Sequence, residues 1–256
     1  MKKSGILIAA LFLMSTTLWA QEYKIKASAN QTLALIEINS ISVEGYDGNE
    51  IVISTESNNS SDEERAKGLT AINGMGLKDN SGIGLSVTEK DGIIEVVPLS
   101  KRGDKTYLVK IPKGMKLKYE HSSSYGRSFN IKNVTGEIEV SSNHNSIFLE
   151  DITGPVTINT VHGNVDAIFT SVNQANPTSI ISAHGLIDVT FPENSKINIK
   201  MSSNWGELYT DMNIAMDESE DGMKEYSSKV SGKINGGGVE VDLSSTHGTV
   251  YLRKKN

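Results

Sequence analysis

A repeated unit of about 20 residues in the C-terminal half constrains the fold more than any other feature of this sequence. Each unit has an aromatic or imidazole ring, then Gly or Asn, one variable residue, and a short run of alternating apolar and polar residues. The spacings between successive rings are 19, 18, 22, 21 and 42 residues, and the last is twice 21. The ring positions are Tyr125, His144, His162, His184, Trp205 and His247. A unit this short cannot bury its own apolar face, so such units stack on one another.

Two short strands and two turns fit into each unit, as in the alternating segments 136–140 and 154–158. Stacking units one strand spacing apart, about 4.8 Å, buries one continuous core. We therefore predict an all-β fold in which residues 116–256 form a right-handed parallel β-helix or similar β-solenoid, with about five to seven coils. A sandwich of meandering hairpins is the alternative all-β fold.

Two local expectations follow from the repeat. The Gly or Asn after each ring is expected to supply the positive φ that a tight corner needs. The doubled last spacing predicts a skipped ring position near the acidic segment 211–226, which is expected to be a loop or short helix inserted between coils.

The region 21–115 is predicted to be β-rich and to cap the solenoid. Turn residues at 45–49 and 90–92, each between apolar runs, predict two hairpins. Pro112 is expected to end a strand over 108–112. Acidic residues after Ser60 and Ser61, followed by Gly68, predict one short capped helix.

Residues 1–20 have the pattern of a secretory signal peptide. Lys2 and Lys3 precede the apolar run 6–14, and Ala20 is a small residue at the expected cleavage site. The run is short for a membrane span, so we expect an exported protein of the periplasm or cell surface, with no membrane span after cleavage. The expected segments are thus the signal peptide 1–20, the N-terminal β-rich region 21–115 and the repeat region 116–256.

Composition and motifs argue against several functional classes. The absence of cysteine excludes a disulfide scaffold and a thiol enzyme, and the net charge of −6 argues against a nucleic-acid partner. We find no Gly-x-Ser-x-Gly elbow, Walker loop, dinucleotide fingerprint or zinc spacing. Residues 217–222 match the start of a calcium loop, but Ser228 stands where an EF-hand needs Glu. We therefore expect no catalytic residue, no cofactor and no metal.

The chain resembles a bacterial family of exported β-strand-repeat proteins of unknown function that are named as adhesins. The resemblance rests on the turn 44–51, the strand 108–114 and the Gly-x-Ile/Val-x-Val units from Gly136 onward. It covers most of the chain after residue 20. The resemblance implies a β-helical protein of the cell envelope, similar to an autotransporter adhesin head, and it supplies no catalytic residues. This sequence has His where the family often has Asn.

Five of the ring residues are candidates for a ladder or a binding site: His144, His162, His184, Trp205 and His247. Equivalent positions stack in a solenoid, so one interpretation is a structural ladder whose rings hydrogen-bond the backbone of the next coil. The other is a metal-binding or proton-sensing stripe of imidazoles. His121 is expected to be a solvated loop residue.

We expect a monomeric, non-catalytic envelope protein that offers a rigid polar surface to a protein or glycan partner. One alternative is an envelope scaffold or signalling accessory without its own ligand. Another is a carbohydrate-active β-helix enzyme, because that fold also carries enzymes. A flat Ser/Thr/Asn face favours the binding protein, whereas acids and bases converging on one groove favour the enzyme.

Overall fold

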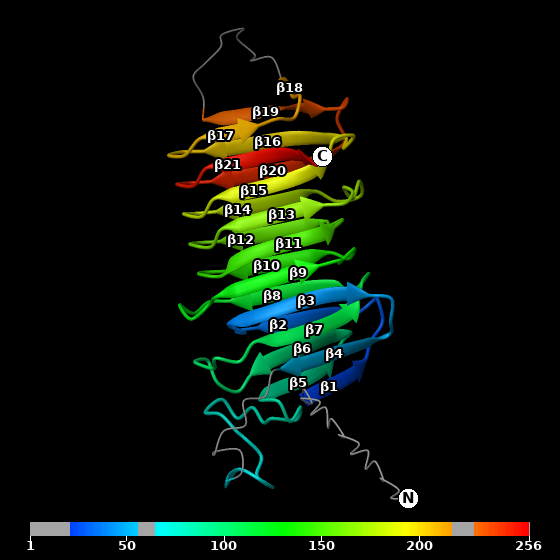
Figure 1. The fold of residues 1–256 in the computed structure, drawn as a ribbon, viewed down its shortest axis with the longest axis vertical. Coiled ribbons are helices and arrows are strands. Elements are labelled where there is room, and N and C mark those ends of the chain that lie inside the picture. Colours follow the sequence, from blue (N-terminus) through cyan, green and yellow to red (C-terminus); the bar gives the residue numbers. More distant parts are fainter. Residues whose placement is uncertain (1–20, 56–64, 217–227, 256) are drawn as a thin grey trace, which may run out of the picture.

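The computed structural model describes residues 21–55, 65–216 and 228–255, and all 21 elements assigned in these ranges are strands (Figure 1). They form two sheets. Sheet A contains, in spatial order, β1 (Gln21–Lys26), β4 (Glu50–Thr55), β7 (Tyr107–Pro112), β3 (Ser40–Tyr46), β9 (Ser128–Lys132), β11 (Ser146–Ile152), β13 (Val165–Phe169), β15 (Ile187–Pro192), β21 (Val250–Lys255) and β17 (Leu208–Thr210). Sheet B contains β18 (Ala215–Met216), β19 (Lys229–Ile234), β16 (Ile197–Ser203), β20 (Val239–Ser245), β14 (Thr178–Ser182), β12 (Val156–Thr160), β10 (Ile138–Ser142), β8 (Lys116–His121), β2 (Thr32–Ile36), β6 (Ile93–Pro98) and β5 (Leu85–Lys90).

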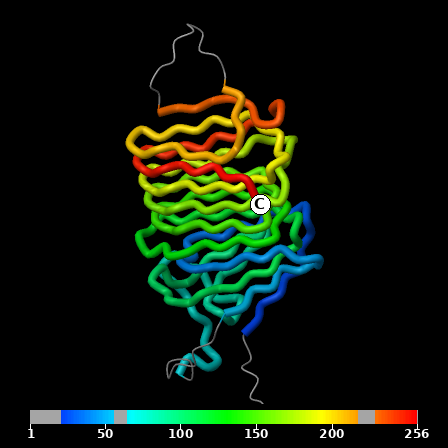
Figure 2. Tube along the Cα trace, turned by 45° about the horizontal axis from the view of Figure 1, so that its top comes forward, coloured from blue at the N-terminus to red at the C-terminus, as the bar shows by residue number. Residues whose placement is uncertain are grey.

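The chain winds from sheet B to sheet A and back, and the coils stack along the long axis (Figure 2). Strands of neighbouring coils pair in parallel and in register, so Ile138 of β10 lies beside Val156 of β12. Alternate residues point inward, where β12 buries Val156 and Ile158. Aromatic rings pack against one another inside the core, with the Phe169 and Phe191 centroids 4.5 Å apart and the rings tilted by 41°. The predicted β-solenoid is confirmed.

Within the described part of residues 116–255, six coils each consist of one sheet B strand and one sheet A strand. They are β8–β9, β10–β11, β12–β13, β14–β15, β16–β17 and β20–β21. Two further coils, β2–β3 and β6–β7, come from the N-terminal region and continue the same sheets. The parallel core therefore begins well before residue 116, and β1, β4 and β5 add antiparallel strands at its lower end.

The coils do not stack in chain order near the C-terminus. After β15 the chain leaves one level empty, forms β16–β17 and the antiparallel β18 and β19, and then returns to fill the empty level with β20–β21. Figure 1 shows the red β20 and β21 between yellow strands. The expectation of a skipped ring position was wrong, because the doubled spacing reflects this excursion of the chain rather than a coil without a ring.

The N-terminal turn predictions had mixed outcomes. β5 and β6 form the hairpin predicted at 90–92, where Asp91 and Gly92 have φ of 51° and 78°. The chain also turns between β3 and β4, but these strands do not pair, because β7 lies between them, parallel to β3 and antiparallel to β4. The prediction of a hairpin at 45–49 was therefore wrong.

Three expectations fall wholly or partly outside the described residues: the signal peptide at 1–20, the first part of the short helix and the calcium-like segment 217–222. In the described remainder of that segment Arg65 alone is helical, and a turn over 66–68 follows it and ends at Gly68 with φ of 80°. In the described ranges we also find no helix that is long and apolar enough to cross a membrane.

Candidate binding surface

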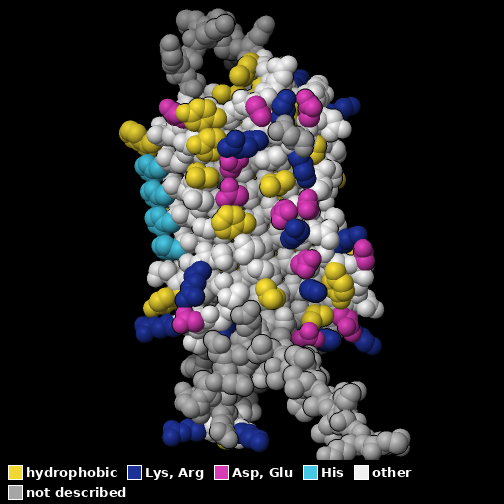
Figure 3. All heavy atoms as spheres, viewed as in Figure 1, with side chains coloured by type: hydrophobic (Ala, Val, Ile, Leu, Met, Phe, Trp, Pro, Cys, Tyr) yellow, Lys and Arg dark blue, Asp and Glu magenta, His cyan; other side chains and the backbone are white. Residues whose placement is uncertain are grey.

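The five candidate residues lie in a single column on one edge of the solenoid, at the corners where sheet B strands lead into sheet A strands. We call this the ring column. Its spatial order is His144, His162, His184, His247 and Trp205, which differs from the chain order. Successive ring centroids are 4.8, 4.9, 4.6 and 6.3 Å apart. Figure 3 shows the four histidines as a continuous stripe along the left edge.

A second column of buried hydroxyl groups fixes these corners from inside. Each hydroxyl lies two residues before a ring and accepts a hydrogen bond from the backbone N–H that follows the ring, at 2.8–3.2 Å. The residues are Ser142, Thr160, Ser182, Ser203 and Ser245. Three of the hydroxyls also donate to a carbonyl of the neighbouring coil: Ser182 to Gly163 at 3.5 Å, Ser245 to Gly185 at 3.0 Å and Ser203 to Gly248 at 2.8 Å. We call these five residues the hydroxyl row.

The glycines after the rings serve close packing rather than positive φ. Gly163, Gly185, Gly206 and Gly248 are absent from the described residues with positive φ, and so is Asn145. A Cβ on Gly185 would instead lie 1.9 Å from the Gly163 carbonyl oxygen of the adjacent coil. The expected φ effect was therefore wrong, because these four glycines lie too close to the backbone of the adjacent coil to carry a Cβ.

Hydrogen bonds between neighbouring coils at the rings come from the backbone. The backbone N–H groups of His162, His184 and His247 each donate to a carbonyl of the adjacent coil at 2.8–3.0 Å. In the described part of the chain, the column's imidazole nitrogens make no hydrogen bond or ion pair, and the four side chains are exposed. The corner is thus held without the ring nitrogens, which remain free to meet a ligand.

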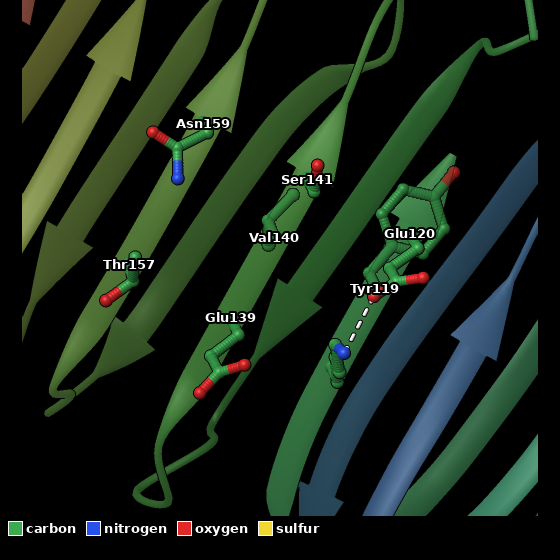
Figure 4. Close-up of a pocket in the computed structure, with 8 residues that line it drawn as sticks. Tyr119, Glu120, Glu139, Val140, Ser141, Thr157 and Asn159 are labelled. Atoms are coloured by element: carbon green, nitrogen blue, oxygen red, sulfur yellow. Dashed lines mark ion pairs between the residues drawn. The ribbon is translucent and has the colours of Figure 1, made fainter. Parts of the chain in front are cut away.

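A shallow hollow of about 240 Å³ lies beside the ring column on sheet B. Hydroxyl and amide side chains dominate its lining, and no charged residue lines it. Its residues are Ser141, Ser142, Asn143, Asn159, Thr160, Val161, Ile181, Ser182, Ala183 and Thr246. A smaller hollow of about 120 Å³ continues along the sheet, where Lys118 pairs with Glu120 at 2.7 Å (Figure 4). Open polar hollows of this size suit an extended partner better than an enclosed small molecule.

Basic residues gather at the foot of the ring column. The Arg102 guanidinium lies 5.8 Å from the centre of the Tyr125 ring, and Arg127 pairs with Asp104. Tyr125 follows the repeat in sequence, but no ring contact joins it to His144 in the described structure. The repeat therefore predicted a common corner position, but ring stacking begins one coil higher.

His121 is buried, with 2% of its surface exposed, so the prediction of a solvated loop residue was wrong. It ends β8 at the register of Ser142 and takes the place that hydroxyl-row residues occupy in the next coils. Its Nε2 lies 3.0 Å from the Asn39 side-chain oxygen, and its Nδ1 has no partner. Burial lowers the pKa of His121; the nearby Glu37 opposes this effect and His144 adds to it.

Lowering the pH from 7.5 to 5.5 should destabilise the fold through His121. Because the folded-state pKa is lowered, the unfolded chain binds more protons as the pH falls below the ordinary imidazole value of about 6.5. Urea unfolding at several pH values should show this loss of free energy of unfolding. The His121→Gln variant should be less stable at pH 7.5 and should lose less stability on acidification. An equal loss in both proteins would contradict the role of His121.

A row of outward side chains on sheet A was not found from the sequence. Register places Phe148, Asp166, Asp188, Tyr251 and Tyr209 side by side on β11, β13, β15, β21 and β17. Arg253 binds Asp188 through two nitrogens, with Nε 2.7 Å from Oδ1. Burial and the neighbouring Asp188 raise the pKa of Asp166. The four-residue spacing of His162 to Asp166 and His184 to Asp188 was the sequence signal for this row.

The described residues contain no cluster of three or more His, Asp or Glu that could hold a metal ion. The stacked histidines and the Asp166–Asp188 pair occupy different faces of the coil. The geometry therefore offers two separate surfaces, an imidazole edge and a carboxylate row.

Comparison with known protein families gives a match for the part of the chain that contains the ring column. Residues 139–253 match the family described as Toastrack DUF4097. This segment is similar to the Toastrack domain. The predicted resemblance is confirmed for the repeats, and the matched residues include all five candidate rings. The turn 44–51 and the strand 108–114, on which the resemblance also rested, lie outside the matched residues.

Two solved structures are similar over most of the chain. A "putative cell adhesion protein" from Clostridium sporogenes ATCC 15579 has 12% identity and a TM-score of 0.48, covering 93% of this chain and 100% of its own. A "putative adhesin" from Bacteroides fragilis NCTC 9343 has 9% identity and a TM-score of 0.32, covering 93% and 98%. Neither similarity is close enough to assign a ligand. No protein with a curated description matches the sequence significantly.

Proposed function

We propose that this is an exported, non-catalytic protein of the bacterial cell envelope that binds an extended protein or glycan partner along the ring column. One observation carries the proposal: five exposed rings occupy equivalent positions in successive coils, with centroids 4.6–6.3 Å apart. Such a surface offers the same contact repeatedly, which suits a ligand that is itself long and repetitive. A catalytic group, in contrast, is normally singular.

The exposure of Trp205 supports binding over a purely structural ladder. Its side chain is 77% exposed, so it adds little to the core. The hydroxyl row, the corner glycines and the backbone hydrogen bonds already fix the corner. Exposed tryptophan is typical of binding sites, where its large face contacts a partner.

Export is supported by the signal-peptide pattern of residues 1–20. Protease treatment of intact and lysed cells that carry the tagged protein would separate the cell surface from the periplasm. Digestion on intact cells would support a surface adhesin, whereas protection until lysis would direct the search to a periplasmic partner.

The binding test compares two double variants of the purified protein on arrays of glycans and envelope proteins. The Trp205→Ala/His184→Ala variant should bind the ligand that the arrays identify for the wild-type protein at least tenfold more weakly. The control variant, Phe148→Ala/Tyr209→Ala, removes exposed rings from sheet A and should keep the affinity within about twofold. Absence of any ligand would instead favour an envelope scaffold or signalling accessory. Equal losses in both variants would contradict the ring column as the site.

A second candidate function, a carbohydrate-active enzyme, rests on Asp166 and Asp188. Glycoside hydrolysis uses a pair of carboxyl groups, one of them with a raised pKa as general acid, and burial beside Asp188 raises the pKa of Asp166. However, these side chains lie on the outer face of a sheet and line neither of the two hollows. Polysaccharide cleavage that disappears in Asp166→Asn would establish the enzyme and overturn the non-catalytic proposal.

A further inference from the structure

The ring column can become a line of positive charge. Imidazoles as a class gain a proton in the range of about pH 8 to 5, and a protonated ring has two N–H donors and no acceptor. The four histidines are exposed, and their ring nitrogens have no partner among the described residues. In its protonated form the column would therefore carry up to four cationic groups, one per coil, with centroids 4.6–4.9 Å apart.

The immediate neighbours of the four histidines do not neutralise this charge. The residues directly before them are Asn143, Val161, Ala183 and Thr246, and those two positions after them are Ser146, Asn164, Leu186 and Thr249. All eight are uncharged. The hollow on the sheet B side likewise has no charged lining residue.

Charged groups lie at the ends and on the adjoining faces. At the foot are Lys101, Arg102, Arg127 and its partner Asp104, with buried His121 and half-buried Glu37 behind them. At the head, Glu207 follows Trp205 and bonds the Tyr209 hydroxyl. Sheet A carries Asp166 and Asp188, and Asp188 pairs with Arg253. Sheet B carries Glu120 and Glu139, and Glu120 pairs with Lys118. The foot therefore extends the cationic edge, and three of these acids, Asp104, Asp188 and Glu120, already have a basic partner.

We propose that the ligand of the ring column is an acidic glycan, lying along the solenoid axis, whose carboxylates pair with protonated histidines and whose binding is therefore strongest at acidic pH. This inference rests on the proposed binding function of the same edge and names its ligand class. Charge complementarity carries it, because a repeated cation at one strand spacing, about 4.8 Å, fits a chain with a repeated anion. The length of one pyranose residue in an extended glycan is close to that spacing.

Two further features favour a glycan over other polyanions. The hollow beside the column presents Ser141, Asn143, Asn159 and Thr246, whose hydroxyl and amide groups can bond sugar hydroxyls. Trp205, at the head of the column, offers an exposed aromatic face on which a sugar ring can pack. The overall charge of −6 gives no long-range attraction for an anion, so recognition depends on this local edge.

Proton uptake is a direct consequence of this arrangement. Protonated neighbours at 4.6–4.9 Å repel one another, and an anion lying along the column removes that repulsion. Binding of the anion and protonation of the rings therefore favour each other, as linkage requires. A column with a structural role alone would take up no protons when a glycan is added.

The test is calorimetric titration of the full mature protein with an oligogalacturonate hexamer at pH 5.5 and 8.0. Each pH is measured in two buffers of different ionisation enthalpy, which reports the protons taken up. We expect at least tenfold tighter binding at pH 5.5, with net proton uptake, and no binding of the neutral hexamer cellohexaose. The His162→Asn/His184→Asn variant should lose at least tenfold in affinity at pH 5.5. The control Lys196→Gln/Lys200→Gln removes two exposed positive charges elsewhere and should bind within about twofold of wild type.

If the histidine variant does not fold, histidine ¹H–¹³C spectra of the wild-type protein replace it. Oligogalacturonate should then shift the column resonances and leave that of buried His121 nearly unchanged. Binding that is equal at both pH values, or tighter binding of cellohexaose, polyphosphate or polyglutamate, would overturn the acidic-glycan inference and leave a binding function intact. Failure of the arrays and the calorimetry to find any ligand would overturn both proposals.

Discussion

Deleting residues 239–256 should destabilise the whole upper stack rather than shorten one of its ends. The deleted strands β20 and β21 lie between β14 and β16 in sheet B and between β15 and β17 in sheet A. Their loss removes four fully buried side chains, Val241, Leu243, Val250 and Leu252. Burying each such side chain contributes about 1.5–3 kcal/mol, so the total approaches the whole stability of an ordinary domain.

The expected result is a fall in melting temperature of more than about 10 °C, together with increased amide exchange in β14–β17. The matched control deletes β1, residues 21–26, which pairs only with β4 at an edge of sheet A and has no fully buried residue. That deletion should cost only a few degrees. A truncated protein that melts cooperatively near the full-length temperature would show that β16 and β17 can move down one level, and would contradict the prediction.

The same two strands show what the sequence could not reveal. The corner motif around His247 is as clear as that around His184, so the existence and local shape of the coil were predictable. Its place in the stack was not, because every coil presents the same kind of edge and interior to its neighbours. Only the connection through β18 and β19, which the local pattern does not encode, decides that β21 pairs with β15 and β17.

The N-terminal turns illustrate the same limit. The turn predicted at 45–49 overlaps the chain reversal after β3, although residues 45 and 46 belong to that strand. Turn chemistry, however, specifies the local backbone only. β4 pairs with β1 and with β7, and in the second pair Thr55 lies opposite Tyr107, far along the chain. At 90–92 the turn and the pairing coincide, and the hairpin prediction was right.

Some missed features did have signals in the sequence. Leu117, Tyr119 and His121 share one phase of an alternating strand, which indicated that His121 points inward like the other two. The corner glycines were misinterpreted for another reason. Glycine suits both positive φ and close backbone approach, and a single sequence does not distinguish these two uses.

Replacing Gly185 by Ala should be one of the most damaging single substitutions in the solenoid. The added Cβ would lie 1.9 Å from the Gly163 carbonyl oxygen, 2.6 Å from its carbonyl carbon and 2.9 Å from the Ser182 hydroxyl. The first two atoms belong to the backbone, so no side-chain rotation relieves the clash. The coils must separate locally, and this would weaken the inter-coil bonds from His184 to Val161 and from His247 to Ala183.

We expect a loss of about 3 kcal/mol or more in the free energy of unfolding, at the upper end of the range for overpacking. Gly74→Ala is the matched control, because Gly74 has no atom within 4 Å of an added Cβ and no positive φ. Urea unfolding of the two variants makes the comparison, and ring-column binding measured in parallel shows whether the spacing of the rings has changed. If Gly185→Ala is as stable as Gly74→Ala, the close approach at this corner is not what requires glycine. If Gly185→Ala is destabilised as expected and also loses affinity, the hydroxyl row and the ring column depend on the same corner. The reason is that an edge that recognises one anion per coil requires an unchanged spacing between coils.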